Sequence, residues 1–82
     1  MAEDSCLQMH KAGEMIMGSR QNGVPLPQMM SLINEADESI RDLLRQIAVE
    51  AYSQPRYNSK EMQKRPISEF SNELYVQCLK SV

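Results

Sequence analysis

The sequence has little of what catalysis or membrane insertion requires. It has a single His and 3 Gly in 82 residues, so no spacing links a histidine to a nucleophile and an acid, and no glycine-rich loop follows a strand. No apolar run approaches the roughly 18 residues that span a bilayer. The sequence also contains no apolar stretch preceded by lysines, which is the pattern typical of a secretory signal. We therefore expect neither an enzyme nor a membrane protein.

Length and charge set further bounds. A chain of 82 residues makes one domain, residues 1–82, and buries only about 60% of the surface that its unfolded form exposes. The net charge of −2 provides no general attraction to nucleic acid or to anionic membranes. We therefore expect a small core of modest stability.

Apolar residues recur at helical spacing in the first half, and no stretch alternates with period two. Asn22-Gly23 followed by two prolines ends a first helix predicted for residues 5–21. Its inner face comprises Cys6, Met9, Gly13, Ile16 and Met17. Pro27 suits the first position of a short second helix that ends near residues 35–38. This helix carries Met29, Met30, Ile33 and Ala36.

The second half predicts a core helix and a long last helix. Ser39 with Asp42, and Asn58 with Glu61, resemble capping boxes at the starts of these two helices. Pro66 predicts a kink, or a turn at 59–64 followed by a helix that starts at Pro66. The third helix carries the stripe Ile40, Leu43, Leu44, Ile47, Ala48 and Ala51, and the last carries Ile67, Phe70, Leu74 and Cys78. We predict an all-α fold, a small bundle of four or five short helices with the N- and C-terminal helices antiparallel.

The two cysteines lie near opposite ends of this predicted bundle. Antiparallel packing of the terminal helices brings Cys6 and Cys78 together, and a disulfide here would stabilise the fold by roughly 4 kcal/mol. Buried reduced thiols are the alternative. His10 lies one turn after Cys6, but a tetrahedral zinc site needs a fourth ligand that no spacing supplies. We expect the disulfide and neither a metal nor a cofactor.

Methionine is frequent, and its flexible thioether suits adaptable binding surfaces as well as cores. Met15, Met17, Met29 and Met30 are too many for the inner faces of two short helices, so we expect some to be exposed. The candidate partner-binding residues are Met15, Met30, Tyr52, Arg56 and Tyr57. A basic cluster around Tyr57 allows weak nucleic-acid binding as an alternative, through Arg56, Lys60, Lys64 and Arg65.

Several segments together resemble small uncharacterised proteins of tailed phages, prophages and proteobacteria, which share an arginine-glutamine-x-glycine turn, a tyrosine-x-x-proline segment and a late cysteine. The matching segments are Arg20-Gln21-Asn22-Gly23-Val24-Pro25, Met29-Met30, Ala51-Tyr52, Pro55-Arg56-Tyr57 and Ile67-Ser68-Glu69-Phe70. The resemblance covers about residues 6 to 79 and implies a helical fold and a phage or bacterial origin. Such proteins often look exported, with cysteines near both ends, which favours the disulfide.

We therefore expect an accessory protein that binds a host or phage protein stoichiometrically, as an inhibitor or modulator of a host complex. A periplasmic, disulfide-stabilised structural or chaperone-like protein is the alternative, and a homodimer is a third. As printed, the sequence is expected in the cytoplasm of a bacterial host. It is expected in the periplasm if Met1 replaces a removed signal peptide.

Overall fold

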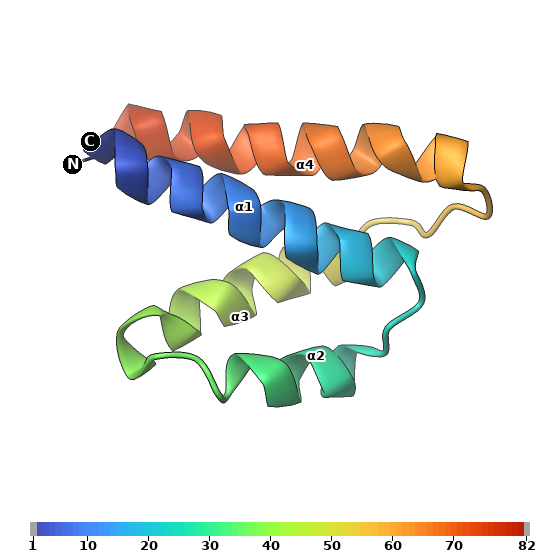
Figure 1. The fold of residues 1–82 in the computed structure, drawn as a ribbon, viewed down its shortest axis with the longest axis horizontal. Helices are drawn as coiled ribbons and strands as arrows, with labels where there is room; N and C mark the ends of the chain where they lie inside the picture. The colour runs from blue at the N-terminus through green and yellow to red at the C-terminus, as the bar shows by residue number, and fades with distance from the viewer. Residues whose placement is uncertain (1, 82) are drawn as a thin grey trace.

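The computed structural model describes residues 2–81 and contains four helices (Figure 1). They are α1 (Ala2–Gln21), α2 (Leu26–Ile33), α3 (Glu38–Tyr52) and α4 (Lys60–Ser81). No strand occurs among these residues, so the predicted all-α fold is confirmed. Met1, on which the expectation of a replaced signal peptide depends, lies outside the described residues.

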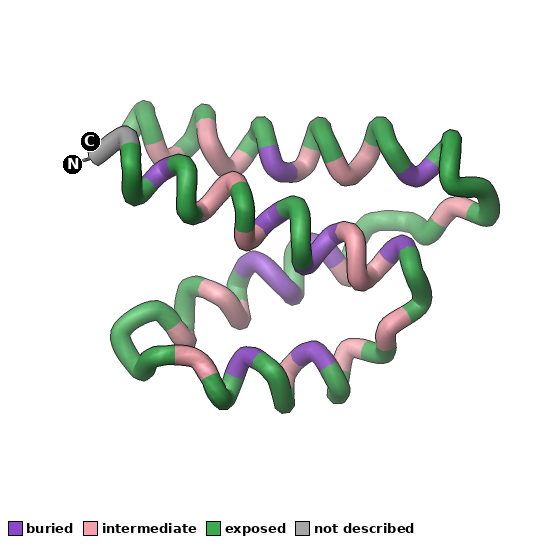
Figure 2. Tube along the Cα trace, in the orientation of Figure 1, coloured by how far each residue is buried: buried purple, intermediate pink, exposed green. Residues whose placement is uncertain are grey.

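Helix α1 lies between α4 on one side and the α2–α3 pair on the other (Figure 1). α1 and α4 run antiparallel along most of their length, which confirms the predicted pairing of the terminal helices. Buried segments occur on every helix and alternate with exposed ones (Figure 2). The central apolar cluster comprises Ile16, Met17, Met29, Ile33, Ile47, Ala48 and Ala51.

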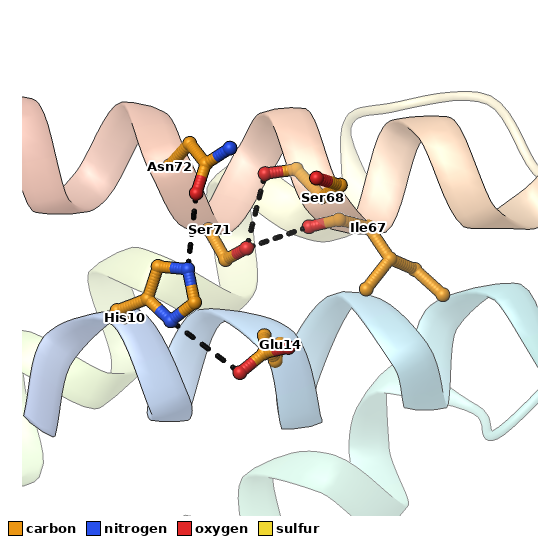
Figure 3. Close-up of polar contacts among 6 residues, drawn as sticks. All are labelled: His10, Glu14, Ile67, Ser68, Ser71 and Asn72. Atoms are coloured by element: carbon orange, nitrogen blue, oxygen red, sulfur yellow. Dashed lines mark hydrogen bonds and ion pairs between the residues drawn. The ribbon is translucent and has the colours of Figure 1, made fainter. Parts of the chain in front are cut away.

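Two small residues let α1 and α4 approach closely. A Cβ atom added to Gly13 would lie 3.3 Å from Ser71 Cα and 2.6 Å from Leu74 Cδ1, so only glycine fits here without a shift. Ser71 is fully buried, and its hydroxyl donates to the carbonyls of Ile67 and Ser68 within α4 (Figure 3). The hydroxyl is therefore satisfied without a partner from α1.

A disulfide joins Cys6 of α1 to Cys78 of α4, across a Cα–Cα distance of 5.4 Å. Cys6 is fully buried where the first turns of α1 meet the last turns of α4. The predicted pairing is confirmed, and the alternative of two reduced thiols does not describe this structure.

The predicted caps of the last two helices are wrong by one or two residues. Asp37, not Ser39, caps α3, because its carboxylate accepts hydrogen bonds from the Ser39 amide and hydroxyl at 3.0 and 2.9 Å. These two hydrogen bonds hold the pKa of Asp37 below its usual value. At α4, Ser59 rather than Asn58 accepts the hydrogen bond from the Met62 amide, at 3.2 Å.

Pro66 lies inside the last helix and does not start a new one, so the second of the two predicted alternatives is wrong. Helix α4 continues from Lys60 to Ser81 through Pro66. Proline removes one hydrogen bond, to the carbonyl of Met62. Helix α1 contacts α4 on both sides of Pro66, at Gln63 through the Gln21 carbonyl and at Ser71 through Gly13. This packing supports the helix across the proline.

The predicted apolar stripe of α3 is too wide, because Ile40 and Leu43 are 46% and 39% exposed. The molecule measures 37 × 26 × 16 Å, and its thickness is less than two helix diameters. Each helix is therefore covered on only part of its surface. Helix α2 is also shorter than predicted, since it ends at Ile33, before the acidic residues 35–38.

Candidate functional site: a groove beside α4

Gln21, the last residue of α1, organises the connection between α3 and α4. Its side chain is fully buried, and its amide nitrogen donates to the Pro55 carbonyl at 2.9 Å. Its amide oxygen accepts from the Tyr57 backbone amide at 2.8 Å. One side chain thus satisfies a donor and an acceptor of a segment that has no regular secondary structure.

The backbone carbonyl of Gln21 is also shared. The Gln63 side-chain amide donates to this carbonyl at 3.1 Å and to the Tyr57 carbonyl at 2.8 Å. The Arg56 guanidinium donates to the Gln21 carbonyl at 3.0 Å. The guanidinium lies against Gly23, whose φ of +86° favours glycine and where a Cβ atom would lie 3.1 Å from Arg56 Nη2. These hydrogen bonds therefore hold residues 55–57 against both α1 and α4.

A second set of contacts joins the end of α3 to the same region. We call this region, formed by the ends of α1 and α3 with residues 54–57, the corner. The Arg20 guanidinium donates to the Gln54 carbonyl at 3.2 and 3.1 Å and lies 5.5 Å from the centre of the Tyr52 ring. The Tyr52 hydroxyl donates to the Val24 carbonyl at 2.6 Å. Burial raises the pKa of Tyr52, although Arg20 opposes this effect, so the hydroxyl keeps its proton.

The corner forms one wall of a groove of about 690 Å³. Gln54, Pro55 and Tyr57 line this wall. The apolar lining from α4 comprises Met62, Pro66 and Phe70. Met17 of α1, which is only 1% exposed, also lines the groove. The groove therefore has apolar side chains from three parts of the chain.

Charged side chains of α4 complete the lining: Glu61, Arg65, Glu69 and Glu73. Arg65 Nε lies 2.9 Å from Glu69 Oε1, and this hydrogen bond raises the pKa of Arg65 further. Both side chains are more than half exposed. Three carboxylates against one guanidinium make the lining acidic.

The predicted partner-binding residues do not form one surface. Tyr52, Arg56 and Tyr57 converge on the corner described above, and Tyr57 also lines the groove. Met15 is 68% exposed on α1, outside the groove, whereas Met30 is half-buried against the apolar cluster. The expectation that some of Met15, Met17, Met29 and Met30 are exposed is confirmed by Met15 alone, and Met62 on α4 is a further exposed methionine, at 57%.

The four basic side chains of the predicted nucleic-acid cluster each have a partner within the protein. Arg56 binds the Gln21 carbonyl, and Lys60 donates to the Asn22 side chain at 3.3 Å. Lys64 pairs with Glu61 at 3.4 Å, and Arg65 pairs with Glu69. Of the four, only Arg65 lines the groove.

His10 connects α1 to α4 instead of joining the cysteines. Its Nε2 lies 3.0 Å from Asn72 Oδ1, and its Nδ1 lies 3.4 Å from Glu14 Oε1 (Figure 3). The ring also meets Tyr75 edge-on, with centroids 6.0 Å apart. Across residues 2–81, no three His, Cys, Asp or Glu side chains are placed to hold a metal ion.

The sequence contained a signal for Gln21 and Gln63 that the prediction did not use. Gln21 continues the spacing of Gly13 and Met17 by four residues, and Gln63 precedes Ile67 by four. Both glutamines therefore belong to the inner faces of their helices. The groove itself had no comparable signal, because its walls come from separate segments.

No helix within the described part of the chain is both long and apolar enough to cross a membrane. Comparisons with protein-family models, with curated proteins and with solved structures found no match.

Proposed function

We propose that this protein acts stoichiometrically by binding another protein through the groove beside α4, as a small phage or bacterial accessory protein that modulates or inhibits a host complex. The observation that carries the proposal is a lining that combines the apolar side chains of Tyr57, Met62 and Phe70 with three carboxylates. A helix or an extended segment that buries an apolar face suits such a groove.

The exposure of the side chains that line the groove favours a macromolecular partner over a small ligand. Glu61, Met62 and Glu69 are all exposed, so a small molecule placed among them would keep much of its surface in water. Small-ligand sites usually bury most of the ligand. A protein segment can gain the same contacts while its own bulk covers the rim.

The groove is also held in a defined shape before any partner arrives. Gln21 binds Pro55 and Tyr57, and Gln63 binds Tyr57 from α4, so the wall opposite the helix has fixed backbone positions. A preformed site loses little conformational entropy on binding. This rigidity supports binding as the role of the groove.

The test is affinity capture with a matched pair of variants. Tagged wild-type protein, Met62→Glu and Met15→Glu are each incubated with lysate of the bacterium that carries the gene. Met62→Glu should reduce recovery of a stoichiometric partner by about tenfold, as expected when an apolar interface contact is lost. Met15→Glu should leave recovery unchanged, because Met15 is equally exposed but lies outside the groove.

Equal loss in both variants, or in neither, would contradict binding through the groove. Nucleic acid as the sole stoichiometric component would favour the alternative through Arg56, Lys60, Lys64 and Arg65. A second copy of the chain would favour the homodimer.

The disulfide favours a second candidate, a periplasmic structural or chaperone-like protein. Disulfides form and persist in oxidising compartments, and Cys6 and Cys78 are joined in this structure. Trapping cellular thiols with a maleimide before lysis separates the candidates. An unmodified, disulfide-linked protein favours the periplasm, and two modified cysteines favour the cytoplasm.

A further inference from the structure

The carboxylates that line the groove indicate the chemistry of its partner. We propose that the groove binds a basic amphipathic segment of another protein, with an apolar face toward Tyr57, Met62 and Phe70 and with lysine or arginine side chains toward Glu69 and Glu73. The inference rests on the proposed function and adds the class of partner.

The three carboxylates of the lining are spread along α4. Glu69 and Glu73 are one turn apart, and Glu61 lies two turns before Glu69. At about 1.5 Å per residue, Glu61 and Glu73 are about 18 Å apart along the axis of α4. A partner helix of about three turns, or six extended residues, covers this distance.

Each carboxylate is already paired on the surface of α4 by a side chain that a partner can replace. Arg65 binds Glu69 at 2.9 Å, Lys64 lies 3.4 Å from Glu61, and the Gln77 amide donates to Glu73 at 3.1 Å. Exposed pairs of this kind contribute little to stability, so exchange for an incoming cation costs little. The Arg65 contact also shows that a guanidinium fits against Glu69.

The apolar contacts give the partner a second requirement. Met62 and Phe70 are two turns apart, with Pro66 between them, and Tyr57 from the loop before α4 lines the same groove. A partner helix can place apolar side chains against this row at intervals of three and four residues. The flexible side chain of Met62 can adapt to their shape. A purely polar cation would leave these contacts unused.

Two synthetic peptides test the charge requirement directly. Both are 15-residue helices with leucines on one face, and they differ only in carrying four lysines or four glutamates on the flanks. Each is titrated into ¹⁵N-labelled wild-type protein at low salt. The lysine peptide should shift the backbone amides of Tyr57, Met62, Phe70 and Glu73, and added salt should weaken it. The glutamate peptide should bind at least about tenfold more weakly.

Variants with opposite expected effects distinguish a basic partner from other occupants. Glu69→Gln with Glu73→Gln should weaken the lysine peptide by about tenfold, at roughly threefold per exposed ion pair. Arg65→Ala should strengthen it by about threefold, because it removes a competing cation and frees Glu69. Glu35→Gln, an exposed carboxylate outside the groove, is the control and should change nothing.

The inference fails if the glutamate peptide binds as well as the lysine peptide, if Arg65→Ala weakens binding, or if the shifted amides lie outside the groove. Its failure differs from failure of the proposed function. If recovery of a captured partner depends on Met62 but not on Glu69 and Glu73, groove binding stands and a basic partner is excluded. If recovery does not depend on Met62, the proposed function is overturned even if the lysine peptide binds.

Discussion

Replacing both Cys6 and Cys78 with alanine is expected to lower the free energy of unfolding by about 4 kcal/mol. The disulfide joins residues separated by 72 positions in the chain, so it restricts almost the entire unfolded ensemble. A domain of 82 residues has a total stability of roughly 4–12 kcal/mol. The double variant should therefore retain about 0–8 kcal/mol, and it is unfolded at 25 °C if the wild type lies at the lower end of its range.

Urea unfolding followed by circular dichroism measures this effect, and reduced wild-type protein is the control. Reduction keeps the cysteine side chains, whereas alanine removes their sulfur atoms. Similar losses of stability in both samples would assign the effect to the cross-link. Midpoints within experimental error of the oxidised wild type would instead show that packing of α1 against α4 suffices on its own.

Gln21→Leu is expected to destabilise the protein by about 2–4 kcal/mol, because it leaves the Tyr57 amide and the Pro55 carbonyl without their partner. The leucine occupies a similar volume, so the loss comes mainly from unsatisfied polar groups. The wall of the groove should also loosen, since Gln21 holds residues 55–57 against α1. Partner binding should therefore fall together with stability.

Gln8→Leu is the matched control, because Gln8 is an exposed residue of the same helix. Its effect should stay within about 0.5 kcal/mol. Urea unfolding gives the free energies, and amide hydrogen exchange reports on the Tyr57 amide, which should lose protection only in Gln21→Leu. Retained protection of this amide would contradict the assigned role of Gln21.

The helical faces were predictable because burial follows a simple period. The spacing of Cys6, Gly13 and Met17 placed them on one side of α1, and the structure buries all three. The disulfide was predictable from the same argument, since antiparallel terminal helices bring their outer ends together. Ile40 and Leu43 were wrongly predicted to be buried. The helical period identifies which face of α3 is apolar, but not how much of that face the other helices cover.

The helix starts were less predictable, because several polar residues can act as caps. Asp37 and Ser39 both suit the start of α3, and Asn58 and Ser59 both suit the start of α4. Small differences in backbone geometry decide between them. Of the two alternatives predicted for Pro66, the new helix start was wrong, because the contribution of α1 packing to α4 cannot be inferred from local sequence.

The groove was outside the reach of sequence reasoning. Tyr57 was selected for its aromatic ring beside basic residues, but its position depends on Gln21, which lies 36 residues earlier. In the sequence, the positions of Met62 and Phe70 are those expected for apolar residues of any amphipathic helix. Only the tertiary arrangement shows that α1 and residues 54–57 leave this side of α4 open.

Site-specific photo-crosslinking tests binding through the groove most directly. p-Benzoylphenylalanine is introduced at Met62 or at Met15, and cells that produce each protein are irradiated before lysis. Binding through the groove predicts one discrete cross-linked protein from position 62 and none from position 15. The same product from both positions, or a product from position 15 alone, would contradict the groove as the binding site.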